Sequence, residues 1–211
     1  MAAGAIQTGP GPECREQVRF AAHQLFEEKG LHKTSVREIA KSAGYTTGAV
    51  YFHYDSKEAI YSEILLFSLK SLTEQVIQAS EEKREPFSAL IASYLAFYRF
   101  YSEASQKLNF DVFFAESDIN SAYLPKFTAE FEKINRCFEK NMKTFGIDPS
   151  RSKEEATLIL GDLIGLVLTL KNPHLTQGPV TEDALVASHL KRLSARLLEQ
   201  AKSDTPGEFA P

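Results

Sequence analysis

Residues 34–58 read TSVREIAKSAGYTTGAVYFHYDSKE, and the spacing of apolar and capping residues within them decides the fold. Ser35-Val-Arg-Glu38 is a helix start in which a hydroxyl caps free N–H groups and Glu38 can reach back to them. This short helix ends at Gly44, and the hydroxyl of Thr46 begins another. Two helices of about two turns, joined by a turn that contains glycine, are typical of a helix-turn-helix.

Helices are also predicted on both sides of this stretch. An apolar stripe with helical spacing predicts a helix over residues 13–29, ended by Gly30. A second capping pattern, Asp55-Ser-Lys-Glu58, opens a helix that continues to about residue 81. A three-helix unit of about 50 residues needs every apolar side chain it has, so we expect a core that includes Val36, Ile39, Val50 and Phe52.

The rest of the chain is also predicted to be helical. Apolar periodicity favours helices over residues 86–103, 124–145, 152–170 and 181–202, with a shorter segment around Phe110 and Phe114. Strand patterns are nearly absent. The sequence therefore predicts an all-α protein with about nine helices.

Composition and charge limit the class of protein. The chain has 211 residues, of which 43% are hydrophobic and 25% are charged, as in globular proteins without a membrane span. The net charge of −4 offers no overall electrostatic argument for nucleic acid, and acidic and basic residues balance within residues 1–60. Two cysteines and an N-terminus without secretion features favour a reducing, cytoplasmic location.

Enzyme motifs are absent from the sequence. It contains no glycine-rich phosphate loop, no Gly-x-Ser-x-Gly and no His-Glu-x-x-His, and its five histidines lack the spacing of metal ligands. We therefore expect no catalytic residues, no metal site and no cofactor.

Three ungapped segments carry a family resemblance. They are AAHQLFEEKG (residues 21–30), TSVREIAKSAG (residues 34–44) and GAVYFHYDSKE (residues 48–58). Together they resemble the N-terminal domain of the tetracycline-repressor-like (TetR) family of transcriptional regulators, over about residues 14–62. The resemblance implies a helix-turn-helix DNA-binding domain in residues 12–56 and a larger ligand-binding and dimerisation domain in residues 57–203. Flexible tails would occupy residues 1–11 and 204–211.

The second of the two short helices suits the major groove of DNA. Thr46 and Thr47 at its N-terminus can donate to phosphates or bases, and Gly48 permits close approach of the two backbones. Tyr45 replaces the small aliphatic residue common in the family, so its side chain either packs on the domain or extends base reading. We favour partial exposure toward DNA.

The family resemblance assigns further roles at this surface. It implies that Thr47 and Ala49 face the groove and that Tyr51 gives its hydroxyl to a phosphate. His53 and Lys57 would lie over the sugar-phosphate strand. Thr34 and Arg37, at the start of the preceding helix, would contact the opposite strand. The predicted DNA-binding residues are Thr34, Ser35, Arg37, Tyr45, Thr46, Thr47, Gly48, Ala49, Tyr51, His53 and Lys57.

The helix-turn-helix domain of residues 12–56, called the head below, has few basic residues, and this predicts a dimer. Phosphate contacts supply most of the affinity for DNA, so a single head would bind weakly and two linked heads are needed. The last two predicted helices of each subunit are the candidates for a four-helix bundle across a two-fold axis. The apolar stripe on either helix could instead close an intramolecular core. The predicted interface residues are Leu158, Gly161, Gly165, Leu168, Val186, Leu190, Leu193 and Leu197.

Aromatic density between residues 94 and 145 indicates a ligand pocket, because pockets in helical bundles are mostly apolar. Most of these rings must nevertheless be ordinary core. Asp162 lies on an otherwise apolar helix, and we expect its carboxylate to be buried there. A buried carboxylate must pair with a cation, cap a loop or bind a ligand. The predicted pocket residues are Tyr94, Phe97, Tyr98, Tyr101, Phe110, Phe114, Phe127 and Asp162.

These patterns together predict a ligand-responsive transcriptional regulator. We expect a homodimer, usually a repressor, that binds a palindromic operator in double-stranded DNA and is released by a small apolar or aromatic effector. The alternative is a DNA-binding family member without a small-molecule inducer. Such a protein would be controlled by a protein partner or would bind at many dispersed sites.

Overall fold

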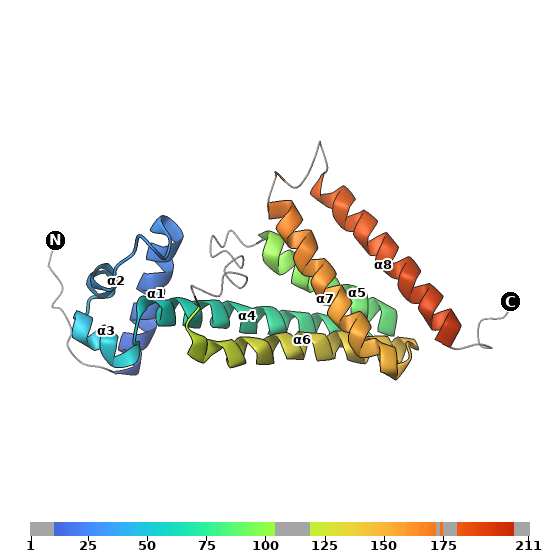
Figure 1. Cartoon of the computed structure of the whole chain (residues 1–211), viewed down its shortest axis with the longest axis horizontal. Coiled ribbons are helices and arrows are strands. Elements are labelled where there is room, and N and C mark those ends of the chain that lie inside the picture. Colours follow the sequence, from blue (N-terminus) through green and yellow to red (C-terminus); the bar gives the residue numbers. More distant parts are fainter. Residues whose placement is uncertain (1–10, 104–118, 172–173, 175–180, 205–211) are drawn as a thin grey trace. The chain divides into compact units, whose positions relative to one another are not determined.

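The computed structural model describes residues 11–103, 119–171, 174 and 181–204, which contain eight α-helices and one 3-10 helix (Figure 1). No strand occurs in these ranges, and the prediction of an all-α fold is confirmed. The elements are α1 (Pro12–Lys29), α2 (Val36–Ala43), α3 (Thr47–His53), α4 (Lys57–Glu81), α5 (Pro86–Glu103), η3 (Ser121–Tyr123), α6 (Leu124–Phe145), α7 (Pro149–Lys171) and α8 (Glu182–Asp204).

The observed bounds follow the predicted ones closely. Helices α5 and α6 occupy the predicted ranges, whereas α7 begins at Pro149, three residues before the predicted start. Pro149 suits the first turn because its ring fixes φ and the missing N–H has no helical partner there. The predicted segment around Phe110 and Phe114 lies outside the described residues.

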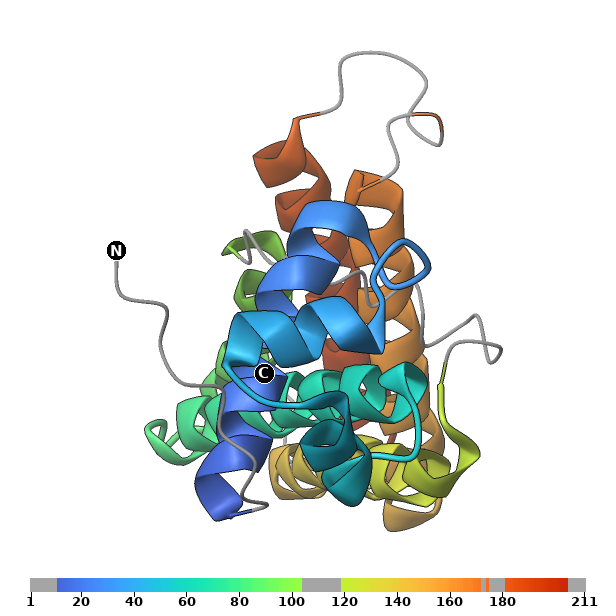
Figure 2. The same ribbon diagram turned by 90° about the vertical axis from the view of Figure 1, so that its left-hand side faces the viewer.

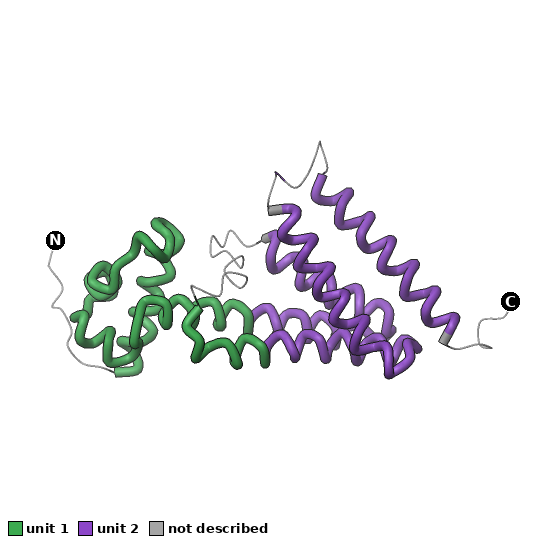
Figure 3. The backbone as a smooth tube through the Cα atoms, viewed as in Figure 1, with its two compact units in different colours: residues 1–70, 105–129 green, residues 71–104, 130–211 purple. Residues whose placement is uncertain are grey.

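The chain divides into two compact units (Figure 3). Unit 1 comprises residues 1–70 and 105–129, and unit 2 comprises residues 71–104 and 130–211. Helices α4 and α6 each contribute residues to both units. This division falls within α4, later in the chain than the functional boundary that the sequence suggested at residues 56 and 57.

Unit 1 is built around the packing of α1, α2 and α3 against one another, seen from its own side in Figure 2. Val18, Ile39 and Val50, one from each helix, are almost completely buried. Phe26 at the end of α1 meets Tyr61 of α4 edge to face, with ring centroids 5.4 Å apart. This core fixes the angle between α2 and α3 and so positions the surface described below.

One predicted core residue lies outside this core. Phe52 was expected to be buried, but 69% of it is exposed, and the prediction is wrong. Val50 and Tyr54 already occupy the inner face of α3 and its end, and both are buried. Phe52 is displaced by about 200° from Val50 on an ideal helix and therefore points outward.

Unit 2 has a separate core drawn from α4, α5, α6 and α7. Tyr94, Phe97, Ile134, Phe138 and Met142 are completely buried. A buried polar network lies among them, in which the Asn141 side chain of α6 donates to Ser80 of α4 at 2.8 Å and to Ser93 of α5 at 3.4 Å. Because these polar groups satisfy one another, they hold three helices together at little cost.

No helix in the described ranges combines the length and the apolar character that crossing a bilayer requires.

Candidate nucleic-acid interface

The turn between α2 and α3 is set by a glycine. Gly44 has φ 78° and ψ 22°, a left-handed conformation that glycine adopts without strain. Its N–H donates to the carbonyls of Ala40 and Lys41 and so ends α2. The chain then reverses through Tyr45 and Thr46 into α3, which completes a helix-turn-helix within unit 1.

A reciprocal capping box begins α2. The Ser35 hydroxyl accepts the N–H of Glu38 at 3.2 Å, and the Glu38 carboxylate accepts the N–H of Ser35 at 3.0 Å. Lys29, at the end of α1, donates to the same carboxylate at 2.8 Å. These bonds, with the one from Lys29 the strongest influence, lower the pKa of Glu38 from its usual 4.5 to about 2.

We expect an NMR titration at low ionic strength to give Glu38 a pKa well below 4.5, near 2. The folded-state pKa is depressed, so the stabilisation is complete above pH 4.5 and is lost as the pH falls toward 2. Lys29→Met should raise the pKa toward 4.5, whereas the exposed neighbour Lys33, changed to Met, should leave it in place. A pKa near 4.5 in the unmodified chain would contradict the capping box.

The first turn of α3 presents an open surface. Thr46 is the N-cap, and its Oγ1 accepts the N–H of Ala49 at 3.2 Å. Thr47 and Gly48 follow, and both are exposed. A side-chain carbon added at Gly48 would meet only Thr46 Oγ1, at 3.8 Å. No described residue therefore requires glycine at this position, which leaves room for another molecule to approach.

One more turn of α3 extends the same face. Tyr51 is 55% exposed and Phe52 is 69% exposed, and they stand four residues after Thr47 and Gly48. Residues four apart lie on one face of a helix. We call these four residues, Thr47, Gly48, Tyr51 and Phe52, the recognition face. The fourth was missed at the level of sequence, although its spacing from Gly48 was a usable signal.

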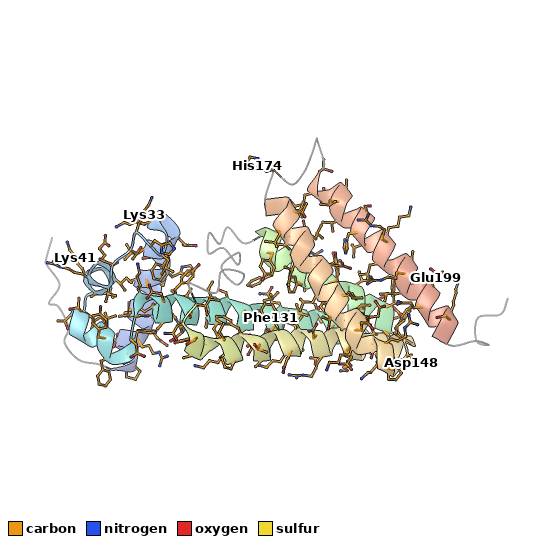
Figure 4. The ribbon with its side chains drawn as sticks, viewed as in Figure 1. Lys33, Lys41, Phe131, Asp148, His174 and Glu199 are labelled. Atoms are coloured by element: carbon orange, nitrogen blue, oxygen red, sulfur yellow. The ribbon has the colours of Figure 1, made fainter. Side chains whose placement is uncertain are left out.

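Cationic side chains surround α2 beside this face. Lys33, Arg37 and Lys41 are exposed, and Arg37 and Lys41 are four residues apart on α2. Figure 4 labels Lys33 and Lys41, whose side chains extend outward from this part of unit 1. Ser35 is also exposed at the start of α2. The basic residues are therefore distributed so that α2 carries positive charge even though residues 1–60 are neutral overall.

Three predicted contact residues are buried inside unit 1, which corrects their assignment. Thr34 is 2% exposed, and its hydroxyl donates to the carbonyls of Gly30 and Leu25, at 2.9 and 3.3 Å. Tyr45 is 6% exposed rather than partly open, because the turn directs its ring into the head. Ala49 is also 6% exposed, since it lies on the side of α3 opposite the solvent. None of the three presents its side chain to a duplex in this structure.

Lys57 has a different role from the predicted one. Its ammonium donates to three main-chain carbonyls in the connection between α1 and α2, those of Leu31 at 3.0 Å, Thr34 at 3.2 Å and His32 at 3.4 Å. An ammonium has three N–H donors, and these three contacts use all of them. Lys57 therefore stabilises the head from inside instead of facing a sugar-phosphate strand.

His53 remains near the surface but has little freedom. It is half-buried, and its Nε2 is buried without a hydrogen-bond partner among the described residues. Its ring meets that of Phe52 edge to face, with centroids 5.2 Å apart. Because this nitrogen is buried, it is not accessible to another molecule in this structure.

The head is braced to α4 by one carboxylate. Arg15 of α1 donates to both oxygens of Glu63, from Nη2 at 2.6 Å and from Nε at 3.2 Å. The Tyr123 hydroxyl donates to the same carboxylate at 3.3 Å, and the Asn120 N–H donates to Ser62 at 2.9 Å. These contacts, all within unit 1, join α1, α4 and the 3-10 helix η3 with its N-cap residue Asn120.

The predicted interface residues behave differently on the two last helices. On α7, Leu158 is 45% exposed, Gly161 and Gly165 are exposed, and Leu168 is half-buried. On α8, by contrast, the predicted stripe packs inside its own unit. Val186, Leu193 and Leu197 are 9%, 4% and 0% exposed, and Leu190 is half-buried. The α8 part of the predicted interface is therefore corrected: its stripe closes an intramolecular core.

The predicted pocket residues are mostly buried core. Tyr94, Phe97, Tyr98 and Tyr101 in unit 2 and Phe127 in unit 1 are each less than 9% exposed, and Phe110 and Phe114 lie outside the described residues. The side chain of Asp162, expected to be buried, is 43% exposed and lies 3.8 Å from Arg196. It lines a cavity together with His189, Arg192, Leu193 and Arg196.

Comparison with known sequences agrees with the helix-turn-helix geometry. Residues 20–64 match the family described as bacterial regulatory proteins, tetR family. Over 82 residues the chain is 35% identical to the HTH-type transcriptional repressor KstR2 of Rhodococcus jostii (strain RHA1), which covers 37% of this chain and 40% of the relative. The match thus spans about two fifths of the length of that curated relative.

Solved structures resemble nearly the whole chain. A bacterial regulatory protein in the tetR family from Rhodococcus RHA1 has a TM-score of 0.63 at 16% identity, covering 90% of this chain and 98% of the other. AibR, solved in complex with isovaleryl coenzyme A and operator DNA, has a TM-score of 0.58 at 18% identity, covering 87% and 97%. At these identities the likeness establishes the fold.

Proposed function

We propose that this chain, a member of the tetR family of bacterial regulatory proteins, regulates transcription by binding an operator in double-stranded DNA as a homodimer. The observation that carries the proposal is the recognition face. A capped helix-turn-helix leaves the first two turns of α3 open at Thr47, Gly48, Tyr51 and Phe52. An α-helix of this kind fits the major groove and reads bases from its N-terminal residues.

Each exposed side chain suits a different contact. Thr47, in the first turn of α3, would meet base edges, while the N-terminus of the helix adds partial positive charge. Tyr51 would donate its hydroxyl to a phosphate, and Arg37 and Lys41 on α2 would neutralise phosphates of the other strand. The outward ring of Phe52 would add apolar contact area beside Tyr51.

A homodimer would present two such heads. Leu158, Gly161 and Gly165 form an open face on α7, where small residues let two helices approach closely. The face of α8 that the buried stripe leaves outside carries Ala184, Ala187, Ala195 and Leu198, all exposed. Two copies of α7 and α8 would form a four-helix bundle across a two-fold axis. Operator half-sites would then be about 34–36 Å apart or somewhat more.

We also propose that a small molecule controls DNA binding and that the regulator acts as a repressor. AibR has been solved with both an acyl thioester of coenzyme A and operator DNA, so the fold accommodates a small ligand and a duplex. An apolar or aromatic effector would favour a dimer whose heads are wrongly spaced for the operator. To release most of the repressor from DNA, the effector must bind the wrongly spaced dimer more tightly than the DNA-binding dimer by several kcal/mol.

A selection of bound sequences from random duplexes tests the proposed function directly. We expect the purified chain to enrich a two-fold-symmetric consensus whose half-sites match two heads of a dimer. Retention of duplexes without any consensus would overturn operator binding. Enrichment of a single half-site would overturn the homodimer.

Two substitutions on the recognition face separate phosphate contact from base reading. Tyr51→Phe should weaken binding to every duplex about equally, by roughly fivefold, because one hydroxyl donor is lost. Thr47→Val keeps the shape of the side chain but removes its hydroxyl, so it should change the preferred base at one position of each half-site. Fluorescence anisotropy on the selected site and on single-base variants measures both effects. A changed consensus in Tyr51→Phe would reverse the two assignments.

A further inference from the structure

The gap between α7 and α8 in unit 2 contains polar groups that apolar packing does not explain. A cavity of about 310 Å³ lies there, lined by Asp162 on α7 and by His189, Arg192, Leu193 and Arg196 on α8. Long polar side chains bridge the two helices beside it. Gln200 donates to Glu155 at 2.5 Å, and Arg196 lies 3.4 Å from the same carboxylate and 3.8 Å from Asp162.

Several of these bridging groups lack hydrogen bonds. Nε and Nη2 of Arg196 are buried and have no hydrogen-bond partner within the described part of the chain, and the same holds for Oε2 of Glu155 and Oε1 of Gln200. The carboxylates of Glu155 and Asp162 are close enough to attract the charge of Arg196, but they accept no hydrogen bond from its Nε or Nη2. Buried polar groups in native proteins are normally satisfied, so the two Arg196 donors indicate a missing acceptor, whereas the oxygens of Glu155 and Gln200 lack a donor.

Tyr94 adds an independent sign of a missing partner. It is completely buried, and its hydroxyl is without a hydrogen-bond partner in the ranges that the structure describes. Its ring stacks on His189, which lines the cavity, with centroids 5.7 Å apart and planes 22° apart. Burial, with a smaller contribution from Asp162, raises the pKa of Tyr94, so the phenol keeps its proton and remains a donor.

Two arginines line the cavity and can hold an anion with a flat apolar body if it displaces the carboxylates of Glu155 and Asp162 from Arg196. Arg192 and Arg196 offer planar donor forks that match a carboxylate in geometry. Burial lowers the pKa of His189, so its ring is neutral at pH 7 and offers an aromatic surface next to Leu193. A volume of about 310 Å³ is at the small end of ligand pockets and suits a compact molecule.

We propose that this cavity binds a small organic carboxylate whose apolar part lies against His189 and Leu193 and whose carboxylate accepts from Arg192 and Arg196. Asp162 and Glu155 then compete with the ligand, because their carboxylates lie 3.8 and 3.4 Å from Arg196 while the cavity is empty. Binding at this site does not require DNA. The proposal rests on the proposed function only in that the bound carboxylate would be the effector.

Calorimetry on the full chain without DNA tests the site with acetate, hexanoate and benzoate as probes and neutral benzamide as the matched control. We expect saturable binding of benzoate or hexanoate and none of benzamide. Arg192→Gln should weaken binding about tenfold, since one charge-assisted contact is lost. Asp162→Asn should tighten it severalfold. Arg136→Gln, a matched change on α6 outside this cavity, should leave it unchanged.

Three results would overturn the site. They are the absence of saturation by every carboxylate below about 10 mM, equal binding of benzamide, and weaker binding in Asp162→Asn. The melting temperature of each variant is measured alongside, so that a folding defect is recognised. A repeat with operator DNA separates the two proposals: benzoate that binds without releasing DNA overturns the effector role alone, while binding by a chain that selects no operator overturns the proposed function alone.

Discussion

Leu158→Glu is expected to leave the chain monomeric at micromolar concentration and to lower its affinity for a two-fold-symmetric operator by at least about a hundredfold. Leu158 is 45% exposed on α7, beside the exposed Gly161. In a two-fold interface the substitution places two carboxylates near each other in an apolar surface, where unpaired charge costs several kcal/mol. Each head would then bind its half-site alone.

The control keeps the charge and moves the position. Gln75→Glu adds the same charge on an exposed part of α4, so it accounts for any general repulsion from DNA. Sedimentation equilibrium measures the dimer, fluorescence anisotropy measures operator affinity, and circular dichroism verifies the helical fold. A Leu158→Glu chain that remains dimeric would place the interface elsewhere. A monomer with full operator affinity would remove the need for a dimer.

The sequence predicted the helices well because their signals are local. Capping residues and glycines mark the ends of α2 at Ser35 and Gly44, and apolar periodicity marks the length of α6. Both signals depend on residues a few positions apart. The same local spacing also located the exposed first turn of α3, including Thr47 and Gly48.

Burial was predicted less well because it depends on residues distant in the chain. Tyr45 and Phe52 are both aromatic residues near α3, yet one is 6% exposed and the other 69%. The α8 stripe has the spacing of a dimer seam, but the same spacing also suits an intramolecular core, and the neighbouring helices decide which occurs. Asp162 was expected to be buried because its neighbours on α7 are apolar. Its environment was set instead by Arg196, which is 34 residues away in the sequence.

Lys57 shows most clearly what a family resemblance leaves open. By motif position it was expected to touch DNA, whereas the structure gives it three carbonyls at the junction of α1 and α2. A lysine can serve either purpose, and sequence position alone does not distinguish the two. The distinction can be measured because the two roles predict opposite patterns of stability and affinity.

Lys57→Met is expected to lower the free energy of unfolding of the chain by about 2 kcal/mol, because three hydrogen bonds from a charged donor to main-chain carbonyls are lost. Methionine preserves most of the aliphatic length of lysine, so the loss reports on the ammonium. Lys41→Met is the matched control: Lys41 is exposed on α2, and its replacement should change stability by less than about 0.5 kcal/mol. Urea denaturation followed by circular dichroism measures both.

Operator binding by the folded fraction gives the opposite ranking. Lys41→Met should weaken binding and reduce the dependence of affinity on salt, because a phosphate contact is removed. Lys57→Met, corrected for any unfolded chain, should bind with nearly unchanged affinity and an unchanged salt dependence. A Lys57→Met chain of normal stability that binds about tenfold more weakly would restore the phosphate contact suggested by the motif. In that case at least one of the three carbonyl bonds would have to break whenever the head meets DNA, since the ammonium has no fourth donor.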